Sequence, residues 1–293
     1  MESRRFSSAV TLGVLALAVF ALSGCLGDAS GPAKSHPYPL AVGNSWLYNH
    51  TIEYQNGVFD TSSGFGYFYL PYQGTTDVRI IEKDTLSDTL EVFVFRAEEE
   101  SENPLPMQHD AYAYANNTDD GFYLYAYEWG STILPAKPQT RRFTFRINGR
   151  DFTSLSDLGE NLSSSVGSIS AAFSPALEIV DPPARSLAYP LRIGSRWTYR
   201  RAGDPFRIDK KVVEYEPISV PTGTEKAYVI QYKWDMDKDG HWDKNLNGFE
   251  YISRRGLIKR EFFYYDVEVI NEELEVIGTV DVIETYVLVE TNL

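Results

Sequence analysis

The fold is decided by an eleven-residue phrase that occurs twice in the chain. Its copies are Tyr38-Pro39-Leu40-Ala41-Val42-Gly43-Asn44-Ser45-Trp46-Leu47-Tyr48 and Tyr189-Pro190-Leu191-Arg192-Ile193-Gly194-Ser195-Arg196-Trp197-Thr198-Tyr199. Six of the eleven positions are identical, and they align two of the five tryptophans of the chain. In each copy the proline fixes φ, the glycine permits a sharp bend, and the tryptophan and the final tyrosine share one face of a strand. The phrase therefore predicts a turn that leads into a strand at the start of two related halves.

The segments that follow each copy are rich in alternating apolar residues. Such runs cover 76–98 and 121–129 in the first half, and 210–234, 248–265 and 274–289 in the second. Leu86-Ser87-Asp88 and Pro221-Thr222-Gly223 have the composition of turns between paired strands, and only 154–165 has the features of a short capped helix. We therefore predict an all-β fold of two antiparallel meander sheets from an internal duplication, packed together or side by side.

Composition sets the expected boundaries of these halves. The first β repeat is expected over 38–162 and the second over 189–293, with a linker rich in Ser, Ala and Pro over 163–188. Residues 25–37 are poor in apolar side chains, which is typical of a flexible tether.

Residues 1–24 have the organisation of a cleaved secretory signal peptide. Arg4 and Arg5 precede an uncharged, mostly apolar stretch that ends in Leu22-Ser23-Gly24-Cys25. These four residues resemble the lipobox of bacterial lipoproteins, in which the cysteine is diacylated, for example with palmitate, and becomes the new N-terminus. The resemblance implies that Cys25 anchors an exported protein to the cell membrane or the outer membrane. The alternative is an uncleaved N-terminal anchor.

A second resemblance rests on the repeated phrase together with Gly256-Leu257-Ile258-Lys259. Both motifs are similar to those of a group of uncharacterised bacterial lipoproteins and secreted β-proteins. The resemblance implies a fold and a location in the cell envelope, and it implies no activity.

The charge and cysteine content exclude several classes of function. Among 293 residues, 27 are Lys or Arg and 41 are Asp or Glu, which gives a net charge of −14. This excess repels phosphate backbones, so we expect no nucleic-acid partner. One cysteine allows no internal disulfide and no cysteine-based zinc site.

The segment Asp235-Met236-Asp237-Lys238-Asp239-Gly240-His241-Trp242-Asp243 is the most specific candidate site. It resembles the Asp-x-Asp-x-Asp-Gly calcium loops of EF-hands, dockerins and thrombospondin type-3 repeats. Calcium takes six to eight oxygen ligands, and the expected ones are Asp235, Asp237, Asp239, the carbonyl of His241, and Asp243. Leu246 stands where an EF-hand has its bidentate Glu, so Glu250, Asn245 or Asn247 would have to complete the shell. The alternative is an acidic hairpin tip without a cation.

An aromatic row forms the second candidate site. Tyr123, Tyr125, Tyr127 and Trp129 alternate along one predicted strand and therefore share a face. An exposed face of this kind could stack sugar rings or hold an acyl chain, whereas the alternative is packing between sheets.

The sequence lacks the common motifs of enzymes. The chain has no Gly-x-Ser-x-Gly, no phosphate-binding loop and no His-Glu-x-x-His. We therefore expect a lipid-anchored envelope protein with a non-enzymatic binding or structural role and a calcium-binding loop. The alternatives are a carrier or chaperone for a lipid or other apolar ligand, and a carbohydrate-binding or carbohydrate-active protein. The sequence does not identify a protein or glycan partner.

Overall fold

The computed structural model describes residues 36–59, 71–103, 107–129, 143–152, 158, 177–200 and 206–293, with only the backbone described at 102–103, 107–109 and 129. The chain divides into two compact units, Met1–Lys34 and Ser35–Leu293, and all described residues belong to the second. The signal peptide, Cys25 and most of the tether lie outside the described residues, as does the expected helix at 154–165 apart from Leu158. No helix in the described ranges has the length and hydropathy needed to cross a bilayer.

The described residues form an antiparallel sheet of 14 strands. The strands are β1 (Ser45–Phe59), β2 (Tyr72–Leu86), β3 (Leu90–Asn103), β4 (Met107–Asn117), β5 (Gly121–Trp129), β6 (Thr144–Ile147), β7 (Arg150–Phe152), β8 (Glu178–Ala188), β9 (Arg196–Arg200), β10 (Arg207–Val220), β11 (Gly223–Asp235), β12 (Leu246–Ser253), β13 (Gly256–Ile270) and β14 (Val276–Thr291). The all-β prediction is confirmed.

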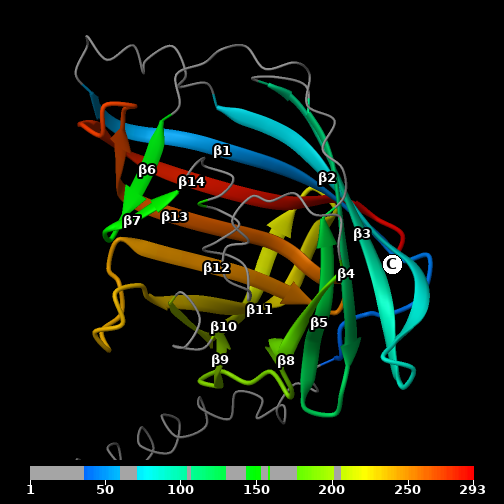
Figure 1. Cartoon of the computed structure of the whole chain (residues 1–293). Coiled ribbons are helices and arrows are strands. Elements are labelled where there is room, and N and C mark those ends of the chain that lie inside the picture. Colours follow the sequence, from blue (N-terminus) through cyan, green and yellow to red (C-terminus); the bar gives the residue numbers. More distant parts are fainter. Residues whose placement is uncertain are drawn as a thin grey trace, which may run out of the picture. The chain divides into compact units, whose positions relative to one another are not determined.

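The two predicted meanders lie side by side and join into one continuous sheet. The strand order is β8-β5-β4-β3-β2-β1-β14-β13-β12-β11-β10-β9, so β1 to β5 with β8 form one run and β9 to β14 form the other. The runs meet where β1 pairs with β14, two strands from opposite ends of the described sequence (Figure 1). At the far ends of the order, the Trp197 indole of β9 donates a hydrogen bond to the Arg185 carbonyl of β8 at 3.0 Å. The sheet therefore curls until its end strands meet.

The repeated phrase builds the same turn in both halves. Gly43 and Gly194 have φ of 95° and 91°, which favours glycine. The Gly43 amide donates to the Ile80 carbonyl at 2.8 Å, and the Gly194 amide donates to the Val212 carbonyl at the same distance. Each turn leads into a strand that carries a buried tryptophan. The predicted turns at 86–88 and 221–223 also connect paired strands, β2 with β3 and β10 with β11.

The segment expected to be a linker contains a strand. Glu178–Ala188 forms β8, which pairs with β5 through Gly121–Tyr127. Two prolines, Pro182 and Pro183, lie within it and favoured a loop on sequence grounds. Because β8 is the last strand in the order, proline's missing N–H is tolerated there better than in a central strand.

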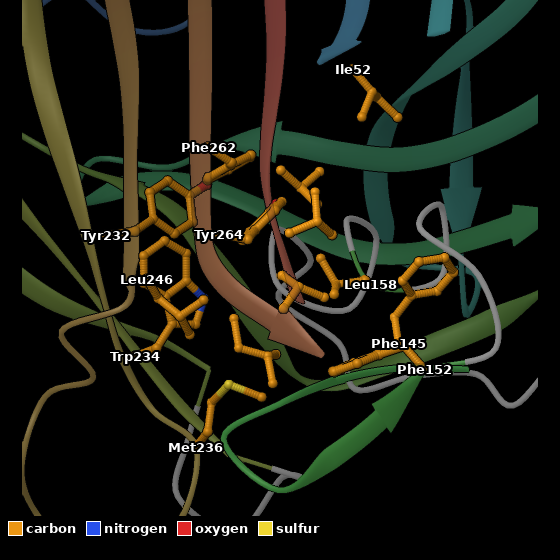
Figure 2. Packing of buried hydrophobic residues seen from close by; sticks show 14 of the residues in the cluster. Ile52, Phe145, Phe152, Leu158, Tyr232, Trp234, Met236, Leu246, Phe262 and Tyr264 are labelled. Carbon is orange, nitrogen blue, oxygen red and sulfur yellow. The ribbon is translucent and has the colours of Figure 1, made fainter. Parts of the chain in front are cut away.

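The largest apolar cluster lies on the face of the sheet covered by the short β6–β7 hairpin. Strands β11 to β13 contribute Tyr232, Trp234, Leu246, Phe262 and Tyr264, while Phe145 and Phe152 come from the hairpin (Figure 2). The hairpin stands outside the main strand order and is attached through pairing of β6 with Glu268–Ile270 of β13. The hairpin therefore packs over one part of the largest apolar cluster.

Candidate functional site

The acidic loop connects β11 to β12. Strand β11 ends at Asp235 and β12 begins at Leu246, so the expected calcium ligands lie on a loop between strands. Lys238 and Gly240 adopt positive φ, 63° and 86°, which turns the chain sharply back on itself. The loop is thus a compact turn with its carboxylates at alternate positions.

Three of the four predicted carboxylates come together. Asp235, Asp237 and Asp239 each place one carboxylate oxygen within 4.8 Å of the others. Backbone amides cap parts of this group: the His241 amide donates to Asp239 Oδ1 at 2.7 Å, and the Gly240 amide donates to Asp235 Oδ2 at 3.3 Å. Three negative charges at this separation repel one another, and a cation would offset that repulsion.

Asp235 differs from its two exposed neighbours because it is only 5% exposed. Its Oδ1 atom is buried and has no hydrogen-bond partner among the described residues. A buried carboxylate oxygen without a partner is costly, so such atoms normally face a donor or a metal ion. Because Asp235 belongs to the carboxylate group, a divalent cation is one partner that could satisfy this oxygen.

Asp243 is used differently from the sequence prediction. Its Oδ2 accepts from the Met236 amide at 2.9 Å, and its Oδ1 accepts from Asn148 Nδ2 at 2.7 Å. Burial raises the pKa of Asp243 to about 6, and the negative charges of the three neighbouring aspartates add to this increase. The structure therefore places Asp243 in a contact between the loop and the β6–β7 turn, outside the group of three.

The residues expected to complete a calcium shell are also engaged elsewhere. Asn245 exchanges side-chain hydrogen bonds with Asn148, Glu250 pairs with Lys210 and Arg260 inside the sheet, and Asn247 Oδ1 accepts from Gln231 Nε2 at 3.4 Å. The His241 side chain is exposed, with Nδ1 3.2 Å from Asp239 Oδ2. Remaining ligands of a cation would therefore be loop carbonyls and water.

The aromatic row of β5 is half-buried. The Tyr123 hydroxyl donates to Asp120 Oδ2 at 2.9 Å, and the Tyr127 hydroxyl donates to Glu178 on the neighbouring strand β8. Tyr125 packs against the small apolar cluster around Val92. The Trp129 side chain lies outside the described residues. The three tyrosines are thus partly packed and partly tied to carboxylates.

Sequence reasoning missed a row of paired charges that crosses the buried face of the sheet. Lys210 of β10 and Arg260 of β13 both bind Glu250 of β12, with Nζ to Oε2 at 2.8 Å and a guanidinium nitrogen to Oε1 at 2.7 Å. Burial would raise the pKa of Glu250, but attraction from Lys210 and Arg260 outweighs it and lowers the pKa to about 2. Glu250 is therefore an ionised, buried anion between two cations.

The row continues across the junction between the two halves at His50 of β1. Its Nδ1 lies 2.8 Å from Glu99 Oε1 of β3, and its Nε2 lies 3.1 Å from Glu284 Oε1 of β14. Burial would lower the pKa of His50, but the hydrogen bonds to Glu284 and Glu99 outweigh it and raise the pKa to about 9. At neutral pH His50 is a cation that joins β3 of the first half to β14 of the second.

A sequence signal for this row exists. Each charged residue interrupts an apolar period-2 face: Lys210 lies between Ile208 and Val212, and Glu284 lies between Val282 and Tyr286. A lone charge at an inward position of a strand indicates a buried partner on another strand.

Comparisons with known proteins add two distant structural likenesses. No family model matches the chain, and no curated protein matches it. A protein from Bacteroides fragilis with a YmcC-like fold, proposed to be exported, aligns with a TM-score of 0.36 at 11% identity over 89% of this chain and 100% of that one. A protein from Parabacteroides distasonis, proposed to be a lipoprotein, aligns with a TM-score of 0.33 at 13% identity over the same shares.

Proposed function

We propose that this chain is an exported, lipid-anchored cell-envelope protein with a non-enzymatic binding or structural role, and that its acidic loop binds calcium. One observation carries the calcium assignment: Asp235, whose buried Oδ1 lacks a partner in the described structure, belongs to a group of three aspartates that each place one carboxylate oxygen within 4.8 Å of the others. Support for the anchor comes from Leu22-Ser23-Gly24-Cys25 after an apolar, uncharged stretch.

The ligand set favours calcium of modest affinity. Hard carboxylate and carbonyl oxygens suit calcium, and its flexible coordination tolerates a shell completed by water. Asp243 is occupied by Met236 and Asn148, and Leu246 replaces the bidentate Glu, so the protein supplies few charged ligands. We expect a dissociation constant of about 10⁻⁴–10⁻³ M, the range of extracellular modules. Magnesium should bind less well because it keeps its own waters and demands an octahedral shell.

The calcium assignment is tested by thermal melts and titration calorimetry on the full-length protein in detergent. Calcium at about 100 times its dissociation constant should add about 2.7 kcal/mol of stability over chelator. Asp237→Ala should abolish most of that gain, whereas Asp119→Ala, at an exposed acidic position in the turn between β4 and β5, should retain it. A melting midpoint that calcium does not move, together with no heat of binding, would identify the loop as an acidic hairpin tip only.

The anchor is tested by metabolic labelling with a palmitate analogue. The wild-type protein should take up label and sediment with membranes, and Cys25→Ser should lose both properties because the acylated sulfur is gone. Label retained on the serine variant would remove the lipoprotein assignment and leave the calcium assignment standing.

A further inference from the structure

The β6–β7 hairpin is too small to hold its position alone. It consists of four residues in β6 and three in β7, joined by three cross-strand pairs. Its attachment to the sheet is a further three pairs with β13. An isolated two-stranded hairpin is marginally stable at best in water, so contacts beyond these ladders decide whether it stays docked.

Asn148 and Arg150 of the hairpin make side-chain hydrogen bonds to the acidic loop. Asn148, at the hairpin turn with φ of 48°, donates to Asp243 Oδ1 and to Asn245 Oδ1 at 2.7 and 2.9 Å, and Asn245 returns a hydrogen bond at 2.8 Å. Arg150 Nε donates to the Met236 carbonyl at 3.0 Å. All the partners named here lie between Met236 and Asn245. This segment contains Asp237 and Asp239 and directly follows Asp235.

Docking also closes the largest apolar cluster. Phe145, Ile147 and Phe152 are at most 8% exposed, and they pack in the same cluster as Met236 of the loop. Figure 2 shows Phe145 and Phe152 pointing from the hairpin toward this core, with Met236 beside the turn. A loop that shifts would move Met236 together with the polar partners of the hairpin.

We infer that calcium bound by Asp235, Asp237 and Asp239 locks the β6–β7 hairpin over the apolar core, so that the loop is a cation-controlled clamp. This inference rests on the proposed calcium site, which the unpartnered, buried Oδ1 of Asp235 supports independently of the hairpin. Without the cation, repulsion among the three carboxylates opens the turn and displaces the Met236 carbonyl and the Asp243 carboxylate from their hairpin partners. By linkage, a docked hairpin must raise calcium affinity by the factor with which calcium favours docking.

The test is amide hydrogen exchange of the full-length protein in detergent, with calcium or with chelator. Calcium should slow exchange in peptides from both 235–247 and 144–152, and should leave 80–95 of the β2–β3 hairpin unchanged. Asn148→Gly removes the side-chain contacts and tolerates the positive φ, so calcium should still protect the loop but no longer the hairpin. The same variant should weaken calcium binding about 5-fold, which is the low end of typical coupling between sites.

A matched control and the contradicting outcomes complete the experiment. Asp88→Gly makes a comparable change at a positive-φ position in the β2–β3 turn and should leave both calcium responses as in wild type. Protection of the loop without protection of the hairpin in the wild type would overturn the clamp while leaving the calcium site intact. Hairpin protection that survives Asn148→Gly would also overturn it. Absence of calcium binding by calorimetry would remove the site and the clamp together.

Discussion

The acidic loop and the charged row of the sheet are two concentrations of charge with opposite organisation. The loop gathers three carboxylates of one sign, two of them exposed, with no cationic side chain among the three. The row alternates signs along the strand order from β10 to β3, with β11 and β2 contributing no charge, and its centre is buried, with Lys210 2% and Glu250 4% exposed. The charges of the row are paired within the sheet, whereas the repulsion within the loop would be offset by the calcium ion that we propose.

This difference in burial and in sign predicts which property of the protein each cluster affects. A buried pair of opposite charges is expensive to break because the remaining partner stays desolvated. A group of like charges with two of its three members in solvent costs little to alter, and a bound ion would stabilise it by mass action. We therefore expect the row to determine stability and the loop to determine the response to calcium.

Breaking the row at its centre should have the largest effect. Glu250→Gln leaves Lys210 and Arg260 without their shared anion, and we expect a loss of about 3–5 kcal/mol in unfolding free energy. Urea denaturation of both proteins in buffer that contains calcium measures this loss of unfolding free energy. The double variant Lys210→Met/Glu250→Gln should be more stable than the single one, because it also removes a buried cation. A single variant within 1 kcal/mol of wild type would mean that the row is solvated.

Raising the pH should weaken the junction at His50. Its folded pKa of about 9 exceeds the unfolded value of 6.5, so its stabilisation is complete below pH 6.5, declines as pH rises, and is lost above about 9. At about 1.4 kcal/mol per pKa unit, the loss is roughly 3 kcal/mol. The groups that face His50 are Glu99, Glu284, Tyr72 and Tyr286.

Unfolding free energies of wild type and His50→Gln between pH 6 and 9.5 measure this loss. The variant should lack the decline. Equal slopes for both proteins would assign the pH dependence to other groups.

Removing one charge from the loop should stabilise the calcium-free protein slightly. Asp237→Asn keeps an oxygen for the Asp239 amide, which lies 3.2 Å away, and relieves repulsion with Asp235 and Asp239. We expect a gain of about 1 kcal/mol or less in chelator, with a smaller response to calcium. Melts in chelator and in calcium give both numbers. Destabilisation in chelator would contradict the view that repulsion strains the empty loop.

Removing an exposed ion pair should change the unfolding free energy least, and it provides the reference value for the buried row. Lys83 and Glu91 lie 2.9 Å apart across β2 and β3, with side chains 50% and 63% exposed. Glu91→Gln should change the unfolding free energy by less than about 1 kcal/mol, and added salt should reduce even that. A larger change would show that exposed pairs of this sheet are not a valid reference for the row.

The sequence by itself determined the features that depend on a few neighbouring residues. The repeated phrase predicted both turns because proline, glycine and alternating aromatics act within eleven positions. The same local rules located β2, β3, β5 and the strands β10 to β14, together with the turns at 86–88 and 221–223, but they did not find β4, β6 or β7 and assigned β8 to a linker. They also located an acidic loop whose Asp235, Asp237 and Asp239 converge because alternate residues on a tight turn point the same way.

Only the tertiary structure decided which distant residues meet. The pairing of β1 with β14 made one sheet from two meanders and brought His50 to Glu284, 234 positions later. Asn148 binds Asp243, which therefore lies outside the carboxylate group, and the proline-containing segment 178–188 forms a strand at the last position of the sheet. Local periodicity fixes which face a side chain occupies, but it contains no information on which strand lies alongside, because that choice depends on closing long loops around a shared core.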